Sequence, residues 1–205
     1  DEAAWDAIVG AVETRFGALH ILVNNAGILG PLDAATPENT TLDSWKQMFA
    51  VNVEGVFLGC RAAIPAMRRA GGGAIVNLSS MADKLATPHT TAYGASKAAV
   101  RHLTKSVAQY CAEQKIGVRC NSVHPGMVLT DMLKDGLTRL AEQRGVSFDE
   151  VAAKSSSKIP LGGFTLPEDI AATVAFLVSD DARHMTGCAL RVDGGLINCN
   201  TFKGG

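Results

Sequence analysis

The sequence lacks the features of several protein classes. It has no basic cluster, and 19 Lys and Arg nearly balance 20 Asp and Glu to give a net charge of −1, so nothing indicates nucleic acid or an anionic membrane as a partner. No uninterrupted apolar run reaches the roughly 18 residues of a membrane span, and the start, DEAAWDAIVG, lacks the basic end of a signal peptide. We therefore expect a cytoplasmic protein.

The sequence also lacks the spacing of a metal site. Its five cysteines are odd in number and contain no C-x-x-C pair, and its five histidines are scattered. We expect reduced, mostly buried thiols and no metal. The cysteines are Cys60, Cys111, Cys120, Cys188 and Cys199.

The composition is that of a globular protein. With 205 residues, of which 47% are apolar and 19% charged, the chain suits one domain, residues 1–205, with a sizeable core. Apolar periodicity predicts helices over residues 2–16, 41–70, 91–113 and 167–179. The runs HILVNN, AIVNL, IGVRCNSV and CALRV are typical of buried strands.

Residues 80–97, SMADKLATPHTTAYGASK, contain three side chains with spacing that chemistry can use. Tyr93 and Lys97, four residues apart, would share one face of a helix. A lysine ammonium beside the phenol would lower the pKa of Tyr93 and make it a proton-transfer group. Ser80 follows a predicted strand, at the edge where open α/β sheets bind ligands. Singly, each has an ordinary alternative: a cap, a half-buried aromatic and a solvated charge.

Two loops and one helix carry further candidates. Asn25, Ala26 and Gly27 follow a strand and permit close approach to a ligand, although a tight turn explains them equally well. Asn52 lies inside a predicted helix, where it has a side-chain role or faces solvent. Pro125 and Gly126 form a turn after the third strand, and Thr130 either contacts a ligand or caps the next helix. Residues 131–160 predict two short helices that form a substrate lid.

Together these segments resemble the short-chain dehydrogenase/reductase family. The resemblance rests on LVNNAG, MFAVNVEGVF, the Ser-Tyr-Lys stretch, VRCNSVHPGMVLTDM and PEDIAATVAFLVSDDARHMTGCALRVDGG, which follow the family's order over nearly the whole chain. It implies an α/β fold with a Rossmann-like, doubly wound parallel sheet. The family's glycine-rich first turn, with its first strands and helices, has no counterpart in the sequence. We therefore expect an N-terminal part that the sequence does not include.

The resemblance implies an NAD(P)-dependent enzyme that interconverts a secondary alcohol, cyclic and steroid alcohols included, and a ketone. Tyr93 would be the catalytic base, Lys97 would lower its pKa and bind the cofactor ribose, Ser80 would donate to the substrate oxygen, and Asn52 would hold a water of the proton path. Ser80 and Tyr93 thereby also bind substrate. The cofactor-binding residues would be Asn25, Ala26, Gly27, Tyr93, Lys97, Pro125, Gly126, Val128 and Thr130.

Several alternatives stay open. NAD is expected in preference to NADP, although the residue that distinguishes them is not in the sequence. The substrate could instead be a 3-oxoacyl chain on a carrier protein, or the chain could be a truncated, non-enzymatic assembly module. The family resemblance further implies a homodimer or homotetramer formed through the helices at 41–70 and 91–113, with the last helix and strand joining in a tetramer.

Overall fold

The computed structural model describes residues 1–30 and 35–198, and these form an α/β fold around a parallel sheet. The sheet order is β1-β2-β3-β4, and all neighbouring strands are parallel. The strands are β1 (Ile21–Asn24), β2 (Gly73–Leu78), β3 (Val118–Pro125) and β4 (Ala189–Val192). Because parallel strands all end at one edge, the loops that follow β1, β2 and β3 converge there.

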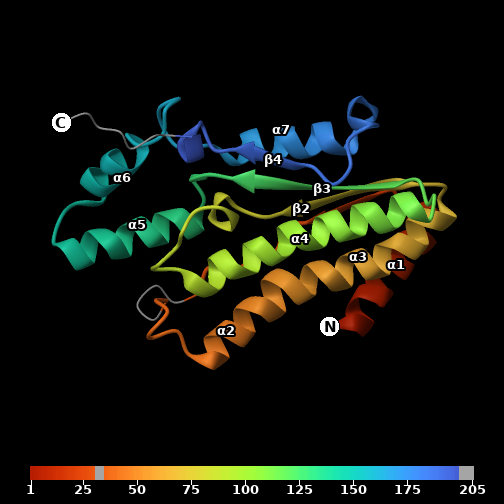
Figure 1. Ribbon diagram of the computed structural model, residues 1–205, viewed down its shortest axis with the longest axis horizontal. Coiled ribbons are helices and arrows are strands. Elements are labelled where there is room, and N and C mark those ends of the chain that lie inside the picture. Colours follow the sequence, from red (N-terminus) through yellow and green to blue (C-terminus); the bar gives the residue numbers. More distant parts are fainter. Residues whose placement is uncertain (31–34, 199–205) are drawn as a thin grey trace.

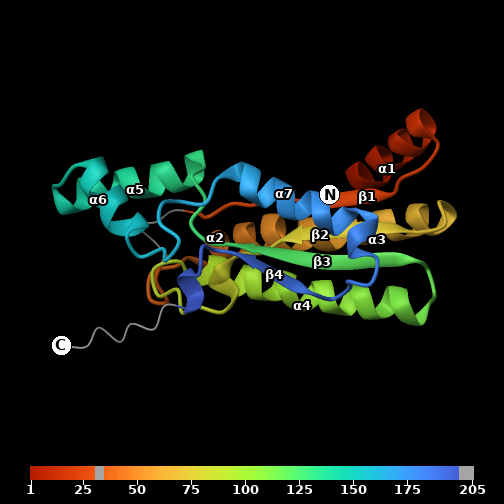
Figure 2. The same cartoon turned by 90° about the horizontal axis from the view of Figure 1, so that it is seen from above.

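Helices cover both faces of the sheet, as the family resemblance predicts (Figure 1). The two long helices α3 and α4 pack on one face and α7 packs on the other, while α1 lies against α3. Helices α5 and α6 lie beyond the carboxyl ends of the strands (Figure 2). Their bounds are α1 (Glu2–Phe16), α2 (Leu42–Phe49), α3 (Gly55–Arg69), α4 (Thr91–Glu113), α5 (Asp131–Arg144), α6 (Phe148–Ser156) and α7 (Pro167–Val178).

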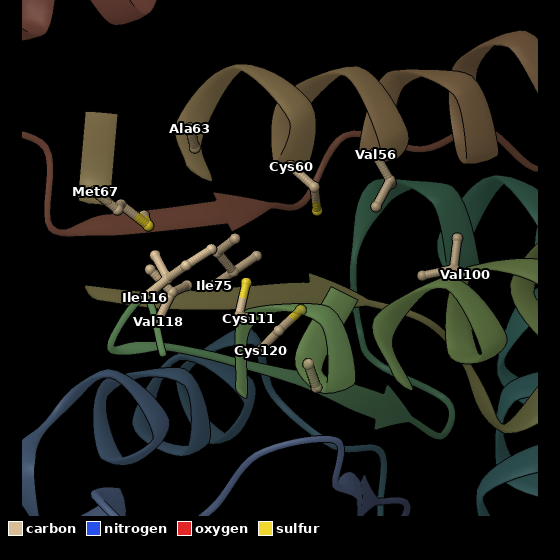
Figure 3. Packing of buried hydrophobic residues seen from close by; sticks show 11 residues of the cluster. Val56, Cys60, Ala63, Met67, Ile75, Val100, Cys111, Ile116, Val118 and Cys120 are labelled. Carbon is tan, nitrogen blue, oxygen red and sulfur yellow. The ribbon is translucent and has the colours of Figure 1, made fainter. Parts of the chain in front are cut away.

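The hydrophobic core occupies both layers between helices and sheet. Between α3, α4 and the sheet it includes Val56, Met67, Ile75 and Val100 (Figure 3). Strand β2 is buried along nearly its whole length, which explains its continuous apolar run, since a central parallel strand is covered on both faces. Fully burying one such valine or isoleucine stabilises the fold by about 1.5–3 kcal/mol.

Local signals explain where helices begin and end. The side chains of Asp1, Thr41 and Ser147 accept hydrogen bonds from the first turns of α1, α2 and α6, which satisfies amides that have no partner within the helix. Gly17 ends α1 with φ of 84°, in the left-handed region that glycine adopts without strain. The predicted bounds 2–16 and 91–113 are confirmed.

The segment predicted as one helix over residues 41–70 is not one regular α-helix. Pro65 lies within α3 and does not end it. The hydrogen-bond pattern changes instead in a π-helical turn, Ala50–Glu54, between α2 and α3. Such turns often mark functional positions, and this one carries Asn52.

The same segment is also the part of the described chain that has the length and composition of a membrane span. Leu42–Arg69 has a mean hydropathy of 1.2 over the relevant window. Because α3 packs on β1 and β2, its apolar face is explained by the core of the domain. This is weak evidence for a membrane helix.

The cysteine thiols are reduced where the structure describes them. Cys60, Cys111 and Cys120 are free and buried, and Cys188 is free and partly buried. Cys199 lies outside the described residues. Within residues 1–30 and 35–198, no group of three or more His, Cys, Asp or Glu side chains could hold a metal ion.

Candidate active site

A cavity of about 800 Å³ opens at the carboxyl ends of the strands. The loops after β1, β2 and β3, the start of α4 and the first turns of α5 and α7 form its wall. All but one of the candidate residues line it. They are Asn25, Ala26, Gly27, Ser80, Tyr93, Lys97, Pro125, Gly126, Val128 and Thr130. The residues that the sequence pattern predicted therefore lie around one cavity, although they come from four separate segments of the chain.

Tyr93 and Lys97 lie on one face of α4, one turn apart, as predicted. The Lys97 Nζ atom is 5.6 Å from the centre of the Tyr93 ring and donates a hydrogen bond of 2.9 Å to the carbonyl oxygen of Leu78. Lys97 is buried, and burial lowers its pKa to about 8 because the ammonium loses its hydration.

The expected lowering of the Tyr93 pKa is wrong for this structure. Burial raises the pKa of Tyr93, and a hydrogen bond from the Ser80 side chain offsets only part of that effect. The physical reason is that the phenolate would lose its hydration, while the Lys97 ammonium is directed to the Leu78 carbonyl group. Near neutral pH, Tyr93 is therefore a phenol, able to donate a proton.

Ser80 is held in a tight turn after β2. It caps the 3₁₀ turn Met81–Asp83, and its Oγ atom accepts a hydrogen bond of 3.1 Å from the Ala82 amide. The cap interpretation and the functional one are thus compatible, because the hydroxyl proton remains free to donate. Ser80 also contacts the Tyr93 side chain by a hydrogen bond.

Asn52 is fully buried behind the cavity, so the solvent-facing alternative is wrong. Its side chain binds both backbone groups of Ile28, at 2.8 Å to the amide and 2.9 Å to the carbonyl oxygen, and donates to Ser96 Oγ at 3.1 Å. The π-helical turn thereby fixes the loop after β1. A Cβ atom on Gly27 would lie 3.3 Å from both Asn52 Oδ1 and Lys97 Nζ.

The turn after β3 is anchored by two residues that the sequence did not indicate. A Cβ atom on Gly126 would lie 2.7 Å from the Cα atom of Asp193, so only glycine fits at this crossing. Thr165 pairs with the segment that follows, through backbone bonds to Met127 and Leu129. Thr130 does cap α5, accepting from the Leu133 amide at 3.4 Å.

Apolar side chains complete the cavity, and the sequence prediction missed them. They come from the loop after Ser80, from the turn after β3 and from α5 and α7: Leu85, Met127, Met132, Leu133 and Ile170. The sequence feature that could have identified them is their position, just after strands or at the start of helices, near the edge of the sheet where ligands bind. His89, in the loop between Ser80 and α4, is exposed and is not part of the cavity wall.

The site fits a nicotinamide cofactor. Gly27 and Gly126 leave the backbone open at two edges of the cavity, where any larger residue would crowd Lys97 or Asp193. In the described structure, the hydrogen bond of the Lys97 ammonium is to Leu78, which leaves it donors for ribose hydroxyl groups.

Comparison with known proteins supports the fold and identifies the family. Residues 1–197 match the family model described as enoyl-(acyl carrier protein) reductase. The chain is 42% identical over 95% of its length to the 2-(R)-hydroxypropyl-CoM dehydrogenase of Xanthobacter autotrophicus, of which it covers 73%. It is 37% identical to the NADP-dependent (R)-specific alcohol dehydrogenase of Lentilactobacillus kefiri, with 95% and 73% covered.

Two further likenesses agree with these. The 3-beta-hydroxysteroid dehydrogenase of Comamonas testosteroni is 36% identical, with 96% of this chain and 73% of the relative covered. The solved structure of the Thermoplasma acidophilum aldohexose dehydrogenase superposes with a TM-score of 0.90 at 29% identity, over 100% of this chain and 78% of that one. The chain belongs to the short-chain dehydrogenase/reductase family of NAD(P)-dependent oxidoreductases.

Proposed function

We propose that this protein interconverts a secondary alcohol and a ketone, with Ser80, Tyr93, Lys97 and Asn52 as its catalytic residues. One observation carries the proposal: Ser80 and Tyr93 are hydrogen-bonded in a cavity into which the Lys97 ammonium also opens. A nicotinamide cofactor, held by Lys97 and the residues around Gly27 and Gly126, supplies the hydride acceptor or donor when bound.

The protein's own residues move the proton and stabilise charge. In ketone reduction, the Tyr93 hydroxyl donates its proton to the carbonyl oxygen as that oxygen becomes an alkoxide, and Ser80 Oγ donates a hydrogen bond to the same oxygen. In alcohol oxidation Tyr93 takes the proton back. Asn52 holds the loop after β1 beside Lys97, and the water that it would bind belongs to the proton path.

The direction of the Tyr93 pKa shift has a consequence for pH. Because burial raises this pKa, the phenol is the dominant form at neutral pH, which suits proton donation and therefore reduction. We expect kcat/KM for alcohol oxidation to increase as pH rises above neutral, since oxidation needs the phenolate. A pH profile that is highest below neutral for oxidation would contradict the role of Tyr93 as base.

The cavity favours a neutral, apolar substrate. Lys97 is the one charged side chain that the described residues contribute to its wall, and our proposal gives this ammonium to the cofactor. The wall of this cavity of about 800 Å³ includes several leucine and methionine side chains and Ile170, which bind alicyclic rings by burial of apolar surface. Cyclic and steroid alcohols are thus the proposed class, and residues 131–160, which include α5 and α6, serve as the lid.

A second candidate is supported by the description of the matching family model, which names an acyl-carrier-protein reductase. Such substrates would be 3-oxoacyl or enoyl thioesters. The relatives at 36–42% identity are instead named as alcohol, hydroxysteroid and hydroxypropyl-CoM dehydrogenases. Turnover of acetoacetyl or crotonoyl thioesters at a higher kcat/KM than cyclohexanone or a ketosteroid would favour the acyl-carrier substrate.

We infer NAD as the preferred cofactor. The relative from Lentilactobacillus kefiri is named as NADP-dependent, which argues for NADP instead. Comparing kcat/KM for NADH and NADPH decides between them.

The protein would act in the cytoplasm as a homodimer or homotetramer through α3 and α4. Analytical ultracentrifugation tests this oligomeric state.

Tyr93→Phe tests the catalytic assignment. The change removes only a hydroxyl, so the fold should persist while kcat falls by a factor of about 10³ or more. Tyr110→Phe is the matched control, because Tyr110 lies on the same helix but is 47% exposed and is not part of the cavity wall. Wild-type rates in Tyr93→Phe would refute the assignment.

A further inference from the structure

A buried charged cluster lies directly behind Ser80 and outside the cavity wall. It joins Asp83, at the end of the turn that Ser80 caps, to His124 near the end of β3 and to Arg101 on α4. The side chains of Asp83 and His124 are each only 1% exposed. Burying a carboxylate this completely is costly unless partners compensate its charge, so the cluster needs an explanation.

The contacts fix how the His124 ring is oriented. Its Nδ1 atom lies 3.1 Å from Asp83 Oδ1 and 3.3 Å from the carbonyl oxygen of Ser80. Both neighbours are acceptors, so Nδ1 carries the proton and donates to them. The Nε2 atom lies 2.7 Å from Ser122 Oγ, which donates to it. Burial lowers the pKa of His124, which favours this neutral ring.

Arg101 supplies the opposite charge. Its Nη1 atom lies 3.2 Å from Asp83 Oδ2, which makes an ion pair. This ion pair is not a hydrogen bond, since Asp83 Oδ2 has no hydrogen-bond partner in the described structure, and neither has Arg101 Nε. The Arg101 side chain is partly exposed, at 31%. Asp83 is therefore held by a hydrogen bond from His124 and by charge attraction to the helix that also carries Tyr93 and Lys97.

The cluster closes the turn in which Ser80 lies. The Asp83 amide donates to the Ser80 carbonyl oxygen at 3.2 Å, and the Ala82 amide donates to Ser80 Oγ at 3.1 Å. The Ser80 carbonyl oxygen thus has donors from both Asp83 and His124. Movement of Asp83 would shift the backbone of Ser80, and with it the hydroxyl that contacts Tyr93.

We propose that Asp83, His124 and Arg101 are positioning residues that fix the Ser80 turn against α4, so that the Ser80 hydroxyl meets the Tyr93 hydroxyl. This inference rests on the proposed function for its kinetic consequence. Its geometric content, the placement of Ser80 against Tyr93, is independent of turnover.

A pair of substitutions at one position separates this role from ordinary packing. The amide nitrogen of His124→Asn can replace Nδ1 as the donor to Asp83 and Ser80, whereas that of His124→Gln lies where Nε2 was. We expect His124→Asn to keep kcat within about threefold of the wild type and His124→Gln to lose about tenfold. Equal losses, or a larger loss in His124→Asn, would overturn the proposal, since packing alone favours the larger side chain.

The same pair in a Ser80→Ala background tests whether the effect passes through Ser80. Residues that act through one group lose their separate effects once it is removed. We expect the difference in kcat between the two His124 variants to shrink to less than about twofold there. A difference that persists undiminished would show that the cluster acts elsewhere and would refute the proposal.

Arg101 gives a second test if the His124 variants fail to fold. Arg101→Met should lower kcat about fivefold with little change in KM, and Arg101→Lys, which keeps the charge, should recover most of it. Equal rates in Arg101→Met and the wild type would contradict the role of the ion pair.

A readout without turnover distinguishes this inference from the proposed function. The sequence has two tyrosines, so Tyr93 can be titrated alone by ultraviolet absorption in a Tyr110→Phe background. The hydrogen bond from Ser80 lowers the pKa of Tyr93; its loss in His124→Gln should move the titration to higher pH, and His124→Asn should not. An inactive protein that shows this shift would refute the proposed function alone, whereas an active one without it would refute the positioning role.

Discussion

At the scale of single residues, the burial of Lys97 lowers the stability of the fold while it places a charged group in the candidate active site. Burial lowers its pKa to about 8 from the ordinary lysine value of 10.5. Between these two pH values the unfolded chain binds more protons at this residue than the folded one, so its contribution to the free energy of unfolding rises with pH there. Below about pH 8 both states hold the proton, and the folded state bears the full cost of the buried ammonium.

We predict that Lys97→Met stabilises the protein at pH 7. The shift corresponds to about 3 kcal/mol, from which about 1 kcal/mol is lost because the Leu78 carbonyl group loses its donor. The advantage over the wild type should shrink as pH rises from 8 to 10.5. Urea unfolding at several pH values measures it, with the exposed Lys105→Met as control. An advantage that grows with pH would contradict the burial argument.

Asn52 is a residue whose structural and functional roles coincide. Removing its amide in Asn52→Ala leaves both backbone groups of Ile28 without their partner, which should lower the free energy of unfolding by about 2 kcal/mol. The control is the exposed Glu54→Ala on the same π-helical turn, which should cost less than about 0.5 kcal/mol. If both variants unfold at the same urea concentration, the Asn52 hydrogen bonds do not stabilise the loop after β1.

At the scale of elements, the contact of α4 with the loop after Ser80 depends on a glycine. Replacing a helical glycine by alanine usually stabilises a helix by about 1 kcal/mol. At Gly94, however, the added Cβ atom would collide with Thr87 Oγ1 and lie 3.3 Å from the Ala82 carbonyl oxygen. Steric overlap should therefore outweigh helix propensity.

We predict that Gly94→Ala destabilises the protein by about 1–3 kcal/mol, while Gly10→Ala stabilises it. Gly10, in α1, is exposed and has nothing within 4 Å of an added Cβ atom. Thermal unfolding compares the two. Adding Thr87→Ala to Gly94→Ala should recover part of the loss by removing the hydroxyl. A melting temperature that rises equally in both glycine variants would show that the loop yields without cost.

At the scale of the whole molecule, local signals predicted more than global ones. The bounds of α4 followed from apolar periodicity, which depends on neighbours in sequence. The placement of Ser80, Asn25 and Gly126 at one sheet edge followed from their positions after predicted strands, together with the parallel sheet that the family resemblance implies. The direction of the Tyr93 pKa shift did not, because it depends on how deeply the folded chain buries the phenol. The π-helical turn at Asn52 likewise forms through bonds to Ile28, a distant residue.

The buried cluster of Asp83, Arg101 and His124 marks the same limit. Each residue belongs to a different element, and nothing in the spacing of the three indicates that they meet. Their contact arises only when α4 packs on β2 and β3. Long-range packing of this kind is also what makes the cavity, which draws on segments from Asn25 to Ile170.

Cofactor binding should therefore stabilise the molecule as a unit. A ligand that binds only the folded state at 100 times its Kd adds about 2.7 kcal/mol, which for a domain of this size raises the melting temperature by about 5–10 °C. We predict such a shift with NADH or NADPH. The rise in melting temperature should be much smaller in Gly27→Ala, because the added Cβ atom would crowd Asn52 and Lys97. In the control variant Gly10→Ala, the rise on adding the nucleotide should equal that of the wild type. Because a non-enzymatic assembly module would bind neither nucleotide, the absence of any shift in the wild type would favour that alternative over a dehydrogenase.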